Sequence, residues 1–202
     1  MDFFMKVKGI ILEPIETFQQ LKEEEIGEVL RYFIIWLLIV SALSAILFSV
    51  MGIALFSLMP ETAEFSMINT FVKAGGGIII AMVMFILILI FGVISLFIGA
   101  GIIHLGVLLV GGTNGYSQTL KSLIYGGTPS YLFGWIPFIG TIGSIWSLIL
   151  IIFGVKELQG ISTGKAIIAI LLPVIILIVI VSFFILALFL SELGPSLVLP
   201  TP

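Results

Sequence analysis

Residues 77–110 read GIIIAMVMFILILIFGVISLFIGAGIIHLGVLLV, a run of 34 residues in which His104 is the one ionisable side chain. The apolar residues follow one another without the alternation of a half-buried strand, which at this length predicts a helix. A straight helix of 34 residues measures about 51 Å, whereas the hydrocarbon core of a bilayer is about 30 Å thick. We therefore expect a membrane-spanning helix that tilts, kinks or protrudes from the bilayer.

The rest of the chain shares this composition. Its 202 residues are 60% hydrophobic and 9% charged, with a mean hydropathy of +1.37, whereas soluble domains contain roughly 25% charged residues. So few charges cannot cover a surface that faces water, which excludes a soluble globule and indicates a multi-pass integral membrane protein. Only helices and closed barrels satisfy the backbone in lipid, and the apolar runs do not alternate, so we expect an all-α fold.

Charged residues mark the breaks between apolar runs. Eleven of the 19 charged residues lie in residues 1–31, and the other eight are Glu61, Glu64, Lys73, Lys121, Lys156, Glu157, Lys165 and Glu192. The runs between them predict a bundle of five transmembrane helices, at about 32–59, 77–110, 117–134, 138–155 and 166–190. Residues 32–190 then form one transmembrane domain, and residues 191–202 form a short flexible tail.

The third run, which contains Lys121 and Pro129, is the weakest, and loop charge decides how it is interpreted. If it crosses the membrane, Lys73 lies on one side and the other seven basic residues lie opposite, namely Lys6, Lys8, Lys22, Arg31, Lys121, Lys156 and Lys165. If it does not cross, the division falls to five against three. The positive-inside rule therefore favours five crossings, with the N-terminus cytoplasmic and the C-terminus outside. A re-entrant hairpin over residues 116–140 is the alternative.

Residues 1–31 carry an amphipathic pattern. Apolar residues recur near helical spacing, with an interruption at Pro14, and these residues are Phe3, Phe4, Val7, Ile10, Ile11, Ile15, Phe18 and Leu21. The pattern predicts one or two short helices lying in the cytoplasmic membrane interface, although a small cap folded against the loops would bury the same stripe. We expect the run Glu23–Glu25 to be a solvated face.

No combination of residues predicts catalysis. His104 has no cysteine and no nearby carboxylate in the sequence with which to build a metal site or a nucleophilic triad, so we expect it to be a packing or interfacial histidine. No Asp, Glu, Lys or Arg lies deep within an apolar run, which argues against a proton relay or ion-coupled transport. The sequence has no cluster of basic residues that would indicate nucleic-acid binding. We therefore expect no catalytic, cofactor-binding or metal-binding residues.

Small residues recur at four-residue spacing in four of the five expected helices. Such stripes let helix backbones approach closely in a membrane. We expect helix packing at Ser41, Ala45, Ser49, Ser95, Gly99, Gly126, Ser130, Gly134, Gly140 and Ser144. Residues 166–190 form a nearly smooth cylinder of Ile, Leu, Val and Phe, and this helix should face lipid most.

Several short motifs occur in a characteristic order along the chain. They are ILEP at 11–14 followed by Thr17 and Phe18, GG at 111–112 with YSQT at 116–119, WIPFIG at 135–140, Trp146, and GV at 154–155 with QGIS at 159–162, then Lys165, Ala166 and Pro173. Together they resemble the Ypt-interacting-protein domain, or Yip domain. The residues that carry the family motif are Pro14, Phe18, Tyr125, Pro129, Trp135, Pro137 and Gly140.

The resemblance implies five spans with a cytoplasmic N-terminus. Eukaryotic relatives are associated with Rab-type GTPases, vesicle traffic and membrane shaping, but only about 31 residues precede the first apolar run here, which argues against a GTPase partner. The chain looks closer to prokaryotic members, which implies the cell membrane.

On these grounds we expect a non-enzymatic protein that organises or shapes the membrane or recruits membrane partners. Its partners would be the lipid bilayer, other membrane proteins or a second copy of the chain. The alternative is a small uncoupled channel or carrier lined by the third and fourth helices, with Thr119, Ser122, Tyr125, Thr128 and Ser130 as its polar lining.

Overall fold

The computed structural model describes residues 1–58, 66 and 70–193, and within these residues it contains helices and no strand, which confirms the all-α prediction. Its elements are α1 (Phe3–Leu12), α2 (Pro14–Leu21), α3 (Ile26–Ser57), η1 (Val72–Gly76), α5 (Gly77–Leu109), α6 (Tyr116–Gly126), α7 (Thr128–Phe133), α8 (Ile139–Gln159) and α9 (Thr163–Leu193). The expected tail at 191–202 lies outside the described residues from 194 onward.

Four helices in the described part of the chain are long and apolar enough to cross a membrane. Their candidate spans are Ile26–Gly52, Ala74–Leu109, Ile139–Gln159 and Thr163–Ser191. They correspond to the first, second, fourth and fifth runs of the sequence, so the chain is a multi-pass membrane protein. The first of these four helices, α3, begins at Ile26. Its first turns therefore lie inside the segment 1–31, which the sequence assigned to interfacial helices.

The third run does not form one continuous helix. It is divided into α6, of 11 residues, and α7, of 6 residues, which meet at Gly127. Pro129 has no N–H to donate to the carbonyl of Tyr125, four residues earlier. The Thr128 hydroxyl donates to that carbonyl instead, at 2.6 Å. Each piece is shorter than the roughly 20 residues that a single spanning helix needs.

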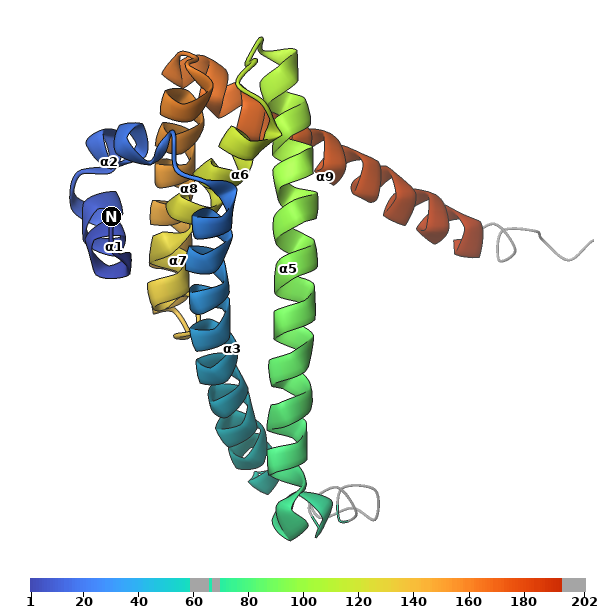
Figure 1. The fold of residues 1–202 in the computed structure, drawn as a ribbon. Coiled ribbons are helices and arrows are strands. Elements are labelled where there is room, and N and C mark those ends of the chain that lie inside the picture. The colour runs from blue at the N-terminus through green and yellow to red at the C-terminus, as the bar shows by residue number, and fades with distance from the viewer. Residues whose placement is uncertain (59–65, 67–69, 194–202) are drawn as a thin grey trace, which may run out of the picture.

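The segments that precede α3 and α6 meet the end of α8 at one end of the molecule. α3 and α5 run side by side along the length of the molecule, while α6 and α7 descend beside them and α8 returns (Figure 1). The Asn114 amide donates to the Leu158 carbonyl at 2.8 Å, which joins the loop before α6 to the end of α8. Lys121 donates to the Lys22 carbonyl at 2.6 Å, which brings the segment before α3 to the same place. We call this the N-terminal end of the bundle.

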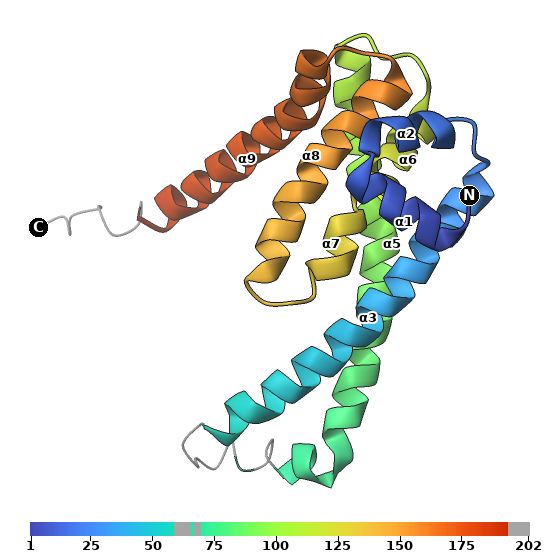
Figure 2. The same cartoon turned by 90° about the vertical axis from the view of Figure 1, so that its left-hand side faces the viewer.

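The main core lies at the N-terminal end of the bundle. Its buried apolar residues come from α1, α2, α3, α5, α6 and α8, with Ile10, Phe18, Tyr32, Ile124, Tyr125 and Leu158 among them. A smaller cluster joins the start of α9 to α5 and α8 through Val107, Val155, Ala166, Ala169 and Ile170. Beyond this cluster α9 leaves the bundle (Figure 2), and every residue from 174 to 191 is exposed. An apolar helix in this state needs lipid around it.

The segment before α3 folds against the bundle. The inner faces of α1 and α2 bury Ile10, Phe18 and Leu21, as the cap alternative expected. The outer face of α1 leaves Phe4 and Leu12 exposed, which an interfacial helix requires. The same segment therefore has the packing of a cap and the exposed apolar face of an interfacial helix.

Candidate functional site at the N-terminal end of the bundle

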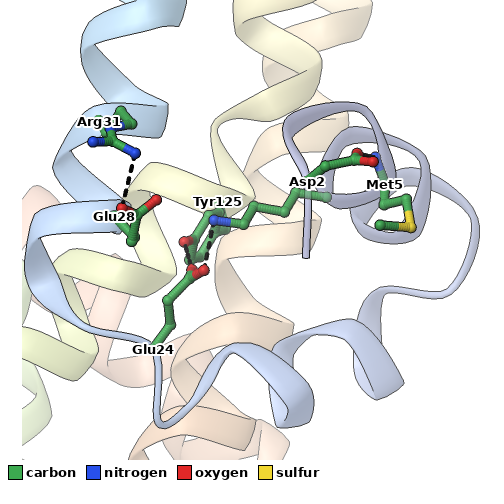
Figure 3. A network of polar contacts seen from close by, with 7 residues as sticks. Asp2, Met5, Glu24, Glu28, Arg31 and Tyr125 are labelled. Carbon is green, nitrogen blue, oxygen red and sulfur yellow. Dashed lines mark hydrogen bonds and ion pairs between the residues drawn. The ribbon is translucent and has the colours of Figure 1, made fainter.

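A buried ion pair with a tyrosine partner joins the segment before α3 to the bundle. Lys6 Nζ lies 2.6 Å from Glu24 Oε1, with the two side chains 4% and 16% exposed. The Tyr125 hydroxyl donates to the other carboxylate oxygen of Glu24 (Figure 3). Lys6 Nζ also lies 5.8 Å from the centre of the Tyr125 ring, within the range of a cation–π contact. The cluster is close to neutral, which is what makes its burial tolerable.

Local structure positions Lys6 for this contact. Asp2 caps α1 by accepting a hydrogen bond from the backbone N–H of Met5 at 2.8 Å. Lys6 then lies on the inner face of the helix between Phe3 and Ile10. A Cβ on Gly9 would lie 2.6 Å from Thr17 Oγ1, so the glycine lets α1 and α2 approach closely.

The polar chain continues inward through two hydroxyls. The Tyr32 and Tyr125 ring centres are 5.1 Å apart. The Tyr32 hydroxyl and Thr128 Oγ1 are 2.8 Å apart, and because Thr128 gives its one hydrogen to the Tyr125 carbonyl, Tyr32 must be the donor. Tyr32 and Thr128 are both buried. The ion pair is therefore connected by hydrogen bonds and ring contacts to the break between α6 and α7.

Lys121 is a second buried cation. Its ammonium donates to the Lys22 carbonyl, which also accepts a hydrogen bond from the Gln118 side chain at 3.1 Å. Lys121 is 5% exposed, so the protein and not lipid surrounds it. This contact explains how a lysine is accommodated in the third apolar run.

A second polar cluster links α5, α6 and α8. His104 Nδ1 lies 2.9 Å from Thr119 Oγ1, and the Gln159 amide donates both to that oxygen and to the Gly115 carbonyl, each at 2.9 Å. The Gln159 side-chain oxygen accepts from the backbone N–H of Asn114 at 3.1 Å. The arrangement fixes the turn between α5 and α6 on the end of α8. Across the described residues, no group of three His, Asp or Glu side chains is placed to hold a metal ion.

A comparison with protein-family models covers most of the chain. The Yip1 domain model matches residues 8–185, from within α1 to α9. The chain belongs to the Yip1 domain family. This confirms the resemblance seen in the motifs. No curated protein and no solved structure matched the chain.

The Yip motif residues cluster around the N-terminal end and the hairpin of α6, α7 and α8. Pro14 begins α2, and the buried Phe18 ring lies against Gly154, where a Cβ would be 2.8 Å from the ring. Tyr125 and Pro129 stand at the helix break. At the turn before α8, the Trp135 indole donates to the Leu132 carbonyl at 2.9 Å, and Pro137 is exposed.

Some of the small residues lie at helix contacts. Ser41 and Ala45 are buried, and Ser49 donates to the Gly77 carbonyl at 3.1 Å, which joins α3 to α5. A Cβ on Gly126 would lie 2.8 Å from the Ile151 backbone nitrogen in α8. In the hairpin, the backbone N–H of Ser130 donates to Ser147 at 2.8 Å, and a Cβ on Gly140 would lie 2.8 Å from the Gly134 carbonyl oxygen.

Other small residues do not meet a neighbouring backbone. Ser95 and Ser144 are exposed, and their hydroxyls donate to carbonyls of their own helices, at 3.1 Å and 2.9 Å. A Cβ on Gly99 would meet the Leu123 side chain at 4.0 Å, an ordinary contact. Gly106, which the spacing did not single out, is tighter than any of them, since a Cβ there would lie 2.0 Å from the Ala169 carbonyl oxygen of α9.

The residues expected to line a channel are used for packing. The hydroxyls of Thr119, Ser122, Tyr125, Thr128 and Ser130 are each hydrogen-bonded to protein atoms. Thr119, Ser122, Tyr125 and Thr128 are also buried. Their arrangement is that of a polar core, which gives the channel alternative no support.

Sequence reasoning missed the Lys6–Glu24 pair. The run Glu23–Glu25 suggested a solvated face, and Glu23 and Glu25 are indeed exposed. Glu24 is different because α1 folds back over it. No local signal separates the three glutamates.

Proposed function

We propose that this Yip1 family protein is non-enzymatic and organises or shapes the bilayer through α1. The supporting observation is that α1 carries large apolar side chains on both of its faces. One face is buried in the bundle, and the other exposes Phe4 and Leu12, at 80% and 64%, together with Met5 and the charged Lys8. A second apolar face on a helix already packed against protein is what an interfacial wedge needs.

The energetics favour insertion of that outer face into lipid. Moving a large apolar side chain out of water is favourable by about 2 kcal/mol. Phe4 and Leu12 together could therefore contribute about 4 kcal/mol less the cost of ordering them. The Lys6–Glu24 pair ties α1 to the bundle, so the inserted helix would stay beside α3 and expand one leaflet locally.

We further propose that the N-terminal end of the bundle faces the cytoplasm and that the C-terminus lies outside. In support, seven of the eight basic residues belong to segments at or near the N-terminal end, while Lys73 belongs to η1 at the opposite end (Figure 1). Because α8 returns to the end at which α6 begins, Lys156 and Lys165 stay on this side whether or not α6 and α7 cross fully.

Five crossings are the arrangement we favour. The 21 residues of α8 measure about 32 Å, so the hairpin of α6, α7 and α8 is deep enough for a hydrocarbon core of about 30 Å. The buried polar groups of α6 face protein and not lipid, as a broken segment at membrane depth requires. This proposal places the chain in the cell membrane, as expected for a prokaryotic member, with the bilayer as its first partner and membrane proteins or a second copy as further candidates.

Reconstitution into vesicles of uniform size tests the shaping role. We expect the full chain to change vesicle diameter or produce tubules, as seen by electron cryomicroscopy, and the double variant Phe4→Ser with Leu12→Ser to lose most of that effect. The matched control is Phe138→Ser, which removes an exposed phenyl ring from the turn before α8. The proposal fails if the wild type leaves vesicles unchanged, or if the α1 variant and the control behave alike.

A further inference from the structure

His104, the one histidine of the chain, lies in α5 where that helix meets α6 and the end of α8. Its Nδ1 atom is 2.9 Å from the Thr119 hydroxyl of α6, and that hydroxyl is 2.9 Å from the side-chain amide of Gln159 in α8. Thr119 is fully buried and Gln159 is 3% exposed, so protein encloses most of this cluster. Neither the ion pair with Tyr125 nor the outer face of α1 uses it.

The orientation of the Gln159 side chain is fixed by its three partners. Its oxygen accepts a hydrogen bond from the backbone N–H of Asn114 at 3.1 Å. Its nitrogen donates to the Gly115 carbonyl and to Thr119 Oγ1, each at 2.9 Å. An exchange of the oxygen and the nitrogen would set two donors together at Asn114 and two acceptors together at Gly115. Thr119 Oγ1 is therefore an acceptor for Gln159.

The hydroxyl hydrogen of Thr119 then decides the state of the histidine. A threonine hydroxyl has one hydrogen to donate. Among the described residues, this hydroxyl is hydrogen-bonded to Gln159 and to His104, and Gln159 is itself the donor. The hydrogen therefore points to His104 Nδ1. A ring nitrogen that accepts a hydrogen bond carries no hydrogen, so the imidazole is neutral, with its hydrogen on Nε2.

Charged side chains on the neighbouring helices make their contacts elsewhere. The titratable group that packs on the ring is Tyr116 of α6, edge-on, with the ring centres 5.6 Å apart. Within the described part of the chain, no charged side chain forms an ion pair or a hydrogen bond with His104. Lys121 of α6 donates to the Lys22 carbonyl, Lys156 of α8 pairs with Glu157 at 2.7 Å, and Lys165 of α9 lies beside Gly111.

We infer that His104 is a pH-sensitive switch that controls how firmly the turn between α5 and α6 is held on α8. While the ring is neutral, the hydrogen bonds run unbroken from Asn114 through Gln159 and Thr119 to Nδ1. Protonation makes Nδ1 a donor, so the Thr119 hydrogen loses its acceptor. The cluster then gives up a buried hydrogen bond and holds a half-buried positive charge without a carboxylate beside it. Acidification therefore releases the turn, and neutral pH restores it.

Nitrogen NMR of the full-length chain, labelled at histidine, tests the state of the ring. The one histidine gives one set of imidazole signals. At neutral pH we expect a single tautomer, with hydrogen on Nε2 and none on Nδ1. Thr119→Ser keeps the hydroxyl and should keep this tautomer, whereas Thr119→Val removes the donor and should allow both. A wild-type ring with hydrogen on Nδ1, or a Thr119→Val variant that keeps the wild-type tautomer, would overturn the inference.

Hydrogen exchange of the same chain in lipid nanodiscs measures the release of the turn. Between about pH 7.5 and about pH 5.5, histidine is the side chain that ordinarily changes charge. The backbone N–H of Asn114 donates to Gln159, so its exchange reports on the cluster. The amide of Gly127, which donates to the Leu123 carbonyl at 2.9 Å, corrects for the intrinsic effect of pH. On acidification we expect exchange at Asn114 to rise about tenfold relative to Gly127, as for the loss of one hydrogen bond.

His104→Gln is the matched variant for the exchange experiment. Its side-chain oxygen can accept from Thr119 and takes up no proton in this range, so the ratio of the two exchange rates should stay constant with pH. Thr119→Val, which leaves the histidine in place, should also lose most of the pH response. An equal response in the wild type and in His104→Gln would overturn the switch. Neither readout depends on vesicle shape, so the switch can fail while the bilayer-shaping role stands.

Discussion

Lys6 and Glu24 form an ion pair of 2.6 Å with both side chains largely withdrawn from water, and this contact holds α1 against the bundle. The two residues are close in sequence but belong to different parts of the structure. Lys6 lies on an amphipathic helix, and Glu24 lies in the turn before the first long apolar helix and bonds to Tyr125 of α6. Removal of either side chain therefore tests how α1 is attached.

Replacement of Lys6 by Met should loosen α1. The variant leaves the Glu24 carboxylate with Tyr125 as its remaining hydrogen-bond donor in the cluster, and loss of one partner from a buried pair costs about 3 kcal/mol. We expect faster hydrogen exchange of the α1 amides and a lower thermal unfolding temperature. Lys8→Met, an exposed change two residues further along the same helix, is the control. Equal effects of the two variants would show that the ion pair does not anchor α1.

Gly106→Ala should displace α9 from α5. The added Cβ would lie 2.0 Å from the Ala169 carbonyl oxygen, a backbone atom that cannot rotate away. Overpacking of this kind costs about 1–3 kcal/mol. The control is Gly101→Ala on the same helix, where no atom lies within 4 Å and the better helix propensity of alanine should stabilise slightly. Thermal unfolding of both variants measures the difference, and a neutral Gly106→Ala would contradict the close contact.

Thr128→Val should destabilise the break between α6 and α7. Valine has the same shape but removes the hydroxyl that donates to the Tyr125 carbonyl and accepts from the Tyr32 hydroxyl, and a buried polar group left unpaired costs about 1–3 kcal/mol. Thr141→Val, an exposed change in α8, is expected to be neutral. Denaturant titration of the two variants provides the comparison, and if the Thr128 variant is as stable as the control, the hydroxyl does not replace the hydrogen bond lost at Pro129.

Much of the fold could be predicted from the sequence because the physical cause is local. Apolar runs bounded by charges become α3, α5, α8 and α9, since the bilayer requires long helices. The smooth composition of the last run correctly indicated a helix exposed along most of its length. The weakness of the third run was also visible in Lys121 and Pro129, although the distribution of basic residues favoured a span.

The candidate site could not be predicted because its contacts join distant segments. Glu24 and Tyr125 are 101 residues apart, and the turn that brings Lys6 back to Glu24 depends on the close approach of Gly9 to Thr17. The sequence marks Gly106 as a place where a neighbouring backbone could approach the second run, but it does not identify Ala169 of α9 as that neighbour. In both cases the residue type is ordinary and the neighbour decides its role.

The central claim is that the loops at the N-terminal end of the bundle all lie on the cytoplasmic side of the membrane. Labelling of single cysteines from each side tests it most directly, because the chain has no cysteine of its own. We would introduce cysteine at Gln20, Thr113 and Thr163, at Ser66 near η1, and at Pro137 in the turn before α8. The first three should react from the cytoplasmic side and Ser66→Cys from outside. Pro137→Cys should also react from outside if α6 and α7 cross, and should fail to do so in a re-entrant hairpin. Reaction of Thr163→Cys from the same side as Ser66→Cys would contradict the arrangement.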